Sequence, residues 1–202
     1  MKKIIYLVRH GDKEKIPGDP PLSDIGLDQA SKTASYFEKL PVSSIFASPI
    51  LRTQQTAKFI ADLLGMKYQI EDLLKERVNW GDDPNQKFEY FLDMWNKSNM
   101  DRDWQPPVGD SSRKSGERLK QAIFKLIKNT NNDSHIILVT HGGITTDFLR
   151  NVFDINELNK FISDFETTLD NNIKECSITT LEVDEKLSSI KLLDLAYINH
   201  LN

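Results

Sequence analysis

Two of the four histidines in the chain come at the end of apolar runs and are each followed by glycine. His10 follows Arg9 after the first run, and His141 ends a later one. Arg52 lies a few residues beyond a third such run. A neutral imidazole can attack phosphorus and form a covalent intermediate, and a planar guanidinium presents paired donors that match phosphate oxygens. These residue types predict a site for a phosphoryl group, provided that the fold brings them together.

A parallel sheet would do this, because functional groups in open α/β sheets gather beyond the carboxyl ends of the strands. Apolar, β-branched runs alternate here with segments whose apolar residues recur at helical spacing, which indicates right-handed crossovers and helices on both faces of the sheet. We therefore predict an α/β fold with a mostly parallel central sheet, in which Ser23 caps the first helix and Gly65 ends the second. The expected strands cover residues 3–8, 42–47, 135–140, 178–183 and 192–197, and the expected helices residues 23–40, 50–64, 88–95, 111–129 and 143–152.

The composition excludes several other classes of protein. The single cysteine cannot form an intramolecular disulfide or supply a zinc cluster. The net charge of −4 argues against a nucleic-acid partner, and no apolar run approaches the ~18 to 20 residues of a membrane span. The first residues are basic and then apolar, but this apolar stretch is shorter than the roughly 7 to 15 residues of a signal peptide. We expect one domain over 1–202, a cytoplasmic location, and a monomer or homodimer.

A metal or nucleotide cofactor is not expected either. Two arginines beside two histidines would repel a divalent cation. The chain has no His-Glu-x-x-His motif, EF-hand loop or paired cysteines, and it lacks the glycine patterns that bind nucleotide phosphates. The sequence therefore predicts phosphoryl chemistry with neither metal nor cofactor.

Four segments of the chain carry a family resemblance when they are taken in order. They are LVRHG at 7–11, PLSDIG at 21–26, SPILRTQQTA at 48–57 and VTHGG at 139–143. Together they resemble the histidine phosphatase superfamily, which includes cofactor-dependent phosphoglycerate mutases and small phosphatases. The resemblance spans nearly the whole chain and implies a phosphoglycerate mutase-like, three-layer α/β/α sandwich.

The resemblance also implies roles for the residues of the site. His10 would be the nucleophile that becomes phosphorylated, and His141 would stabilise charge on the phosphoryl oxygens in the transition state. Arg9 and Arg52 would clamp the phosphate. The alternatives are structural: a strand-end histidine bonded to backbone, a helix-capping histidine and a solvated helix arginine.

A proton donor for the leaving group is expected from one of two carboxyl groups. Leu74-Lys75-Glu76-Arg77 resembles the segment that carries the acidic residue of the family, so Glu76 is the first candidate for acid and base catalysis. Gly109-Asp110-Ser111 resembles the Gly-Glu-Ser helix start of the family but has aspartate in place of glutamate. Asp110 is therefore a reserve candidate, and a helix-capping carboxylate is its alternative.

Further substrate contacts are expected from Arg77, which would add positive potential for an anionic leaving group, and from Gly142, where a bare backbone permits close approach. The stretch 79–109 contains three tryptophans and a Pro-Pro pair and is expected to be a partly helical insertion. Its aromatic residues at helical spacing are typical of core, although they could also roof the pocket.

Hydrolysis is favoured over phosphoryl transfer between two positions of a substrate. The mutases resembled here have longer chains and a Glu-Ser-x-x-Asn pattern after Arg-His-Gly, whereas Asp12-Lys13-Glu14-Lys15-Ile16-Pro17 stands at that place in this chain. A mutase must keep water from its phosphohistidine. We expect a metal-independent phosphomonoesterase that acts on small phosphorylated metabolites. The alternatives are a phosphoglycerate mutase-type enzyme, a protein phosphohistidine phosphatase and a non-catalytic module that binds a phosphorylated ligand.

Overall fold

The computed structural model describes residues 2–128, 130–131 and 133–202, and its centre is a six-stranded sheet. The strand order is β3-β2-β4-β1-β5-β6. The first four strands of this order pair in parallel, while β5 is antiparallel to both of its neighbours. The predicted α/β fold with a mostly parallel sheet is thus confirmed. The strands are β1 (Lys2–Arg9), β2 (Val42–Ala47), β3 (Tyr68–Ile70), β4 (His135–Thr140), β5 (Ile178–Asp184) and β6 (Ser189–Tyr197).

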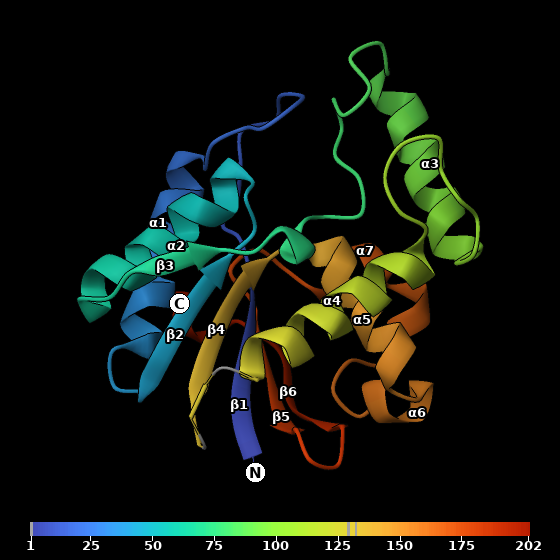
Figure 1. The fold of residues 1–202 in the computed structure, drawn as a ribbon. Helices are drawn as coiled ribbons and strands as arrows, with labels where there is room; N and C mark the ends of the chain where they lie inside the picture. Colours follow the sequence, from blue (N-terminus) through green and yellow to red (C-terminus); the bar gives the residue numbers. More distant parts are fainter. Residues whose placement is uncertain (1, 129, 132) are drawn as a thin grey trace.

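Helices cover both faces of the sheet, as expected for three layers. Figure 1 shows α1 and α2 together on one side of the strands and α4 and α5 on the other. In the part of the chain that the structure describes, no helix has the length and apolarity needed to cross a membrane. The helices are α1 (Asp24–Phe37), α2 (Leu51–Leu64), α3 (Phe88–Met100), α4 (Ser112–Ile127), α5 (Gly142–Val152), α6 (Ile155–Leu158) and α7 (Leu169–Asn172), with 3-10 turns η1 (Asp72–Leu74), η2 (Phe165–Thr167) and η3 (Asn199–Leu201).

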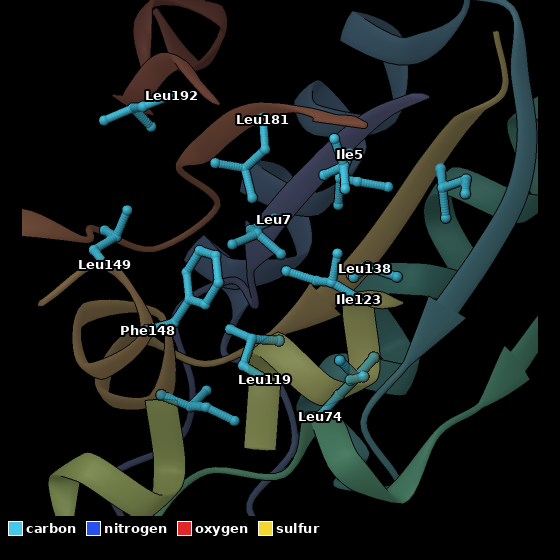
Figure 2. Packing of buried hydrophobic residues seen from close by; sticks show 14 of the residues in the cluster. Ile5, Leu7, Leu74, Leu119, Ile123, Leu138, Phe148, Leu149, Leu181 and Leu192 are labelled. Atoms are coloured by element: carbon cyan, nitrogen blue, oxygen red, sulfur yellow. The ribbon is translucent and has the colours of Figure 1, made fainter. Parts of the chain in front are cut away.

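The central strand β1 is buried from both sides. Successive side chains of a strand point to opposite faces. Ile5 and Leu7 pack in the cluster beneath α4 and α5, shown in Figure 2, whereas Tyr6 and Val8 pack in the cluster beneath α1 and α2. This two-sided burial explains the continuous apolar run of the strand, and it holds the carboxyl end of β1, where His10 follows, in a fixed place.

Local signals set the helix ends that the sequence predicted. The Ser23 hydroxyl accepts a hydrogen bond from the Gly26 N–H at 3.2 Å and caps α1. Ser111 caps α4 in the same way, and Gly65 ends α2 with a left-handed φ of 63°. The predicted end of the fourth helix, residue 129, lies outside the described residues, as does residue 1.

The differences from the predicted elements lie at the periphery. The strand β3 has only three residues and pairs with β2 alone, so it is too short for its side-chain alternation to be seen in the sequence. The helix expected at 88–95 continues to Met100, and β6 begins three residues earlier than expected, at Ser189. The short helices α6 and α7 fall below the length at which periodicity can be recognised.

Candidate active site

His10 lies directly beyond the carboxyl end of β1, and its two ring nitrogens have different partners. Its Nδ1 lies 2.7 Å from the carbonyl oxygen of Gly11. Because a carbonyl can only accept a hydrogen bond, the ring proton is on Nδ1. Its Nε2 accepts a hydrogen bond from Nε of Arg52 at 3.0 Å. The lone pair of Nε2 is therefore the nucleophilic electron pair of this imidazole.

His141 occupies the matching place at the end of β4. Its ring lies edge-on to that of His10, with centroids 5.2 Å apart. Its Nδ1 accepts from Nη2 of Arg52 at 3.1 Å, so its Nε2 carries the proton and donates to the hydroxyl of Ser48 at 2.9 Å. The guanidinium of Arg52 thus joins the two imidazoles, and Ser48, at the end of β2, orients the second one.

Burial sets the protonation state of both histidines. The exposed fraction is 4% for His10 and 0% for His141. Loss of solvation is the largest cause that lowers each pKa well below its ordinary value, and the positive charge of Arg52 acts in the same direction. Both imidazoles are therefore neutral at physiological pH, which is the state in which His10 can attack.

The first turn of α2 places Arg52 in this buried position. Besides the two imidazoles, Nη2 of Arg52 donates to the side-chain oxygen of Asn79 at 2.7 Å. The backbone N–H of Asn79 is in turn held by Asp82 at 2.7 Å. Asn79 is not found by sequence reasoning, because a lone asparagine in a loop carries no pattern.

Arg9 reaches the same space from the end of β1. Its guanidinium donates to the backbone carbonyl of Ile173 and to the carboxylate of Glu175, while its buried Nε finds no partner among the described residues. Arg9 lies directly against Gly142, where an added Cβ would come within 3.3 Å of three of its side-chain atoms. The bare backbone of Gly142 therefore provides the space that Arg9 occupies.

Glu76 sits opposite these cations, at the N-terminus of α5. Its Oε2 accepts from the N–H of Gly143 at 2.9 Å, and its Oε1 accepts from Ile144 at 2.7 Å and from Arg77 at 2.9 Å. A carboxylate at a helix N-terminus is favoured by the helix dipole. These bonds fix the carboxylate on the wall of the cavity that His10 faces.

Asp110, the reserve candidate, does not line this cavity. Its carboxylate pairs with Nε of Arg118 at 2.9 Å. The same guanidinium donates to the backbone carbonyls of Leu73 and Lys75, both at 2.8 Å, and of Glu76 at 3.3 Å. Asp110 and Arg118 therefore hold the chain segment that carries Glu76.

Arg77 lines the cavity, and two of its guanidinium nitrogens bind protein groups, whereas its buried Nε has no partner among the described residues. Its Nη1 lies 3.0 Å from Oδ1 of Asp147, and both side chains are almost completely buried. Its Nη2 donates to Asn99 at 2.7 Å, and the Trp95 ring centroid lies 3.7 Å from its central carbon. Burial raises the pKa of Asp147 to about 6, while Arg77 opposes that rise. Asp147 also escapes sequence reasoning, since nothing in the sequence marks a pairing across 70 residues.

The cavity above these residues has a volume of about 410 Å³. Phe88 and Leu92 line it with 43% and 41% of their surface exposed, so the expectation that the aromatic residues of 79–109 are core is wrong for this helix. The side of α3 that shows apolar periodicity faces a cavity; periodicity identifies a shared face and does not identify what covers it. Among the described residues, no group of three histidine, cysteine, aspartate or glutamate side chains is arranged to hold a metal ion.

The fold and site define a class of phosphoryl-transfer protein, and comparison with known proteins gives the family. The family model of the histidine phosphatase superfamily (branch 1) matches residues 5–195. The chain belongs to this superfamily.

Similar proteins are named both as mutases and as phosphatases. A probable phosphoglycerate mutase, GpmB, of Yersinia pestis (strain Pestoides F) is 32% identical over 150 residues, and the match covers 68% of this chain and 69% of the relative. A mycobacterial glucosyl-3-phosphoglycerate phosphatase shares the fold with a TM-score of 0.75 and 19% identity, over 98% of this chain and 100% of that one. Phosphoserine phosphatase of Entamoeba histolytica, solved with 3-phosphoglyceric acid, has a TM-score of 0.70 and 22% identity, over 99% and 100% of the chains. The predicted phosphoglycerate mutase-like fold is thus confirmed.

Proposed function

We propose that the protein is a metal-independent phosphomonoesterase that hydrolyses small phosphorylated metabolites through a covalent phosphohistidine on His10. The observation that carries this proposal is the state of one atom. Nε2 of His10 is unprotonated, lies at a cavity wall and is bonded to the guanidinium of Arg52. A bound phosphoryl group would take the place of Nε2 as the acceptor for Arg52, which frees the lone pair for attack.

In the first step, Nε2 of His10 forms a bond to phosphorus while the bond from phosphorus to the leaving oxygen breaks. Arg52 and the unpartnered Nε of Arg9 would donate to the phosphoryl oxygens and offset their charge. Glu76 would deliver a proton to the leaving oxygen. Oε1 of Glu76 accepts two backbone N–H bonds and Oε2 accepts one, so Oε2 keeps a lone pair that can carry this proton.

In the second step, water attacks the phosphohistidine. Glu76, now ionised, takes a proton from the water, the bond from nitrogen to phosphorus breaks, and inorganic phosphate leaves. His10 returns to its neutral state with the proton still on Nδ1. The Asp110–Arg118 pair would act as a positioning element, because it fixes the backbone of Glu76.

A second candidate, a mutase, is supported by the name of the Yersinia relative. The two functions differ in the fate of the phosphoryl group, which goes to water in a phosphatase and back to the substrate in a mutase. Hydrolysis is supported by the cavity, which would let water reach His10, and by the absence from the sequence of the Glu-Ser-x-x-Asn pattern after Gly11.

The test is a ³²P-labelled phosphomonoester assay that separates inorganic phosphate from isomeric product. We expect inorganic phosphate as the product, no loss of activity with EDTA, and a loss of at least about a thousandfold in His10→Asn. His135→Asn is the matched control, since His135 lies at the opposite end of β4 from His141 and its ring bonds to the hydroxyl of Tyr6. Isomeric product with little free phosphate would instead establish the mutase.

A further inference from the structure

The cavity beside His10 has two chemically different parts. Its cations lie at the phosphate end: Arg9, Lys13 and Arg52 all line it. Burial is the largest cause that lowers the pKa of Lys13, and the charges of Arg52 and Arg9 lower it further, which places these three residues within electrostatic reach of one another. The phosphate end can therefore neutralise a phosphoryl dianion.

The opposite wall is a continuous row of aromatic rings. The ring centroids of Trp80 and Phe88 are 4.8 Å apart, those of Phe88 and Phe91 6.3 Å, and those of Phe91 and Trp95 5.9 Å. All four rings line the cavity, and Leu92 joins them from α3. Figure 1 shows α3 standing beyond the carboxyl ends of the strands, apart from the helices that cover the sheet.

This wall offers no free positive charge to a substrate. Among the described residues, one further arginine or lysine lines the cavity, and this is Arg77. Its charge is paired with Asp147, and its unpartnered Nε is buried. The acidic group at this wall is Asp170, which lines the cavity and accepts hydrogen bonds from Trp95 at 2.8 Å and from Asn99 at 3.1 Å. Apart from the neutral side chains of Asn96, Asn99 and Thr146, a carboxylate on the leaving group would meet apolar rings and a second carboxylate.

We infer that the substrate is a phosphate monoester of an uncharged apolar or aromatic alcohol, whose carbon skeleton packs against the row Trp80, Phe88, Phe91 and Trp95. This inference rests on the proposed phosphatase function and names the substrate class of the same site. Burial of an aromatic or alkyl group against these rings removes apolar surface from water. A phosphoglycerate would forgo this contact and would bring its carboxylate close to Asp170.

The test compares primary alkyl phosphates whose alcohols have similar reactivity, so that only the apolar surface changes. We expect kcat/KM to rise from ethyl phosphate to hexyl phosphate to 2-phenylethyl phosphate, by roughly tenfold or more over the series. 3-Phosphoglycerate should be turned over no faster than ethyl phosphate. A kcat/KM for 3-phosphoglycerate above that for 2-phenylethyl phosphate would overturn the inference.

A pair of variants on α3 locates the effect. Phe91 lines the cavity, whereas Tyr90, its neighbour in sequence, is 52% exposed and does not line it. Phe91→Ala should lower kcat/KM about tenfold for 2-phenylethyl phosphate and less than about twofold for ethyl phosphate, and Tyr90→Ala should change neither. An equal loss on both esters in Phe91→Ala would refute the packing argument.

The two levels of the proposal fail in different ways. Hydrolysis of ethyl phosphate that depends on His10, with no preference for the larger esters, would overturn the substrate class and leave the phosphatase function standing. If none of these esters is hydrolysed in a reaction that depends on His10, the phosphatase function itself is wrong, and the substrate class with it.

Discussion

The buried pair of Arg77 and Asp147 predicts that two single substitutions respond to pH in opposite directions. Arg77→Met leaves the carboxylate of Asp147 buried and unpaired, which costs about 3 kcal/mol at pH 7. For a chain of this size that corresponds to a fall in Tm of roughly 6 to 12 °C. Asp147→Asn places a neutral group of similar size beside Arg77, as the protonated carboxyl of the wild type does, and should cost less at pH 7.

The raised pKa of Asp147 separates the two variants at lower pH. Burial raises this pKa from its ordinary value of 3.8 to about 6, so the folded state binds the proton more tightly than the unfolded state does. The wild type therefore gains stability from this group as the pH falls through 6 toward 4, by about 1.4 kcal/mol at pH 5.

Asp147→Asn cannot make this gain, so between pH 7 and pH 5 the wild type should gain about 1.4 kcal/mol of stability relative to this variant. In Arg77→Met the carboxyl loses the cation that held its pKa down. This carboxyl then takes up its proton more readily than in the wild type. The destabilisation of Arg77→Met relative to the wild type should therefore be about 1 kcal/mol smaller at pH 5 than at pH 7.

Urea unfolding of the three proteins at pH 7 and pH 5 measures these differences. Asp62→Asn is the control: it removes an ion pair in which both side chains are more than 60% exposed and should leave the urea midpoint unchanged at both pH values. Equal pH dependence of Asp147→Asn and Arg77→Met would refute the buried-pair argument. Full stability of Arg77→Met together with a hundredfold loss of kcat/KM would make Arg77 a substrate-binding residue instead.

Three further predictions concern the site and its supports. Gly26→Ala should destabilise the protein by about 1 to 3 kcal/mol in urea unfolding, because a Cβ there would come within 1.9 Å of the backbone carbonyl oxygen of Asp12. An unchanged urea midpoint would show that the segment at Asp12 moves freely to make room. The pKa values of His10 and His141 are lowered in the folded state, so the unfolded state binds protons more tightly below pH 6.5. The free energy of unfolding should therefore fall as the pH drops from 7 to 5, by up to about 1.4 kcal/mol per histidine and pH unit. His141→Asn should show a shallower dependence of this free energy on pH. Asp110→Asn should lower kcat about tenfold with little change in KM, because Arg118 loses the carboxylate that holds it against the backbone of Glu76. A change confined to KM would argue against a positioning role.

Much of the fold could be predicted from the sequence, because its signals are local. Apolar β-branched runs marked the central strands, and Ser23 and Gly65 marked helix ends through bonds and backbone angles within a few residues. The rule that functional groups gather beyond the carboxyl ends of strands then placed His10 and His141 beside each other, and the structure finds their rings 5.2 Å apart.

The parts that could not be predicted depend on contacts distant in sequence. Asn79 reaches Arg52 from a loop, and Asp147 on α5 pairs with Arg77, which lies outside the helices. Neither contact leaves a periodic trace. Phe91 shows a third limit, since apolar spacing on a helix predicts a common face equally well for core and for a cavity wall.

The covalent intermediate on His10 is the central claim, and rapid quenching tests it most directly. The enzyme is mixed with ³²P-labelled p-nitrophenyl phosphate, quenched in alkali within one turnover, and the labelled peptide is mapped. The account predicts label on His10 in a bond that is stable to alkali and labile to acid, as a phosphoramidate is. Label on a serine, an aspartate or another histidine would contradict it. The absence of labelled protein during turnover that is not limited by the first step would contradict it as well.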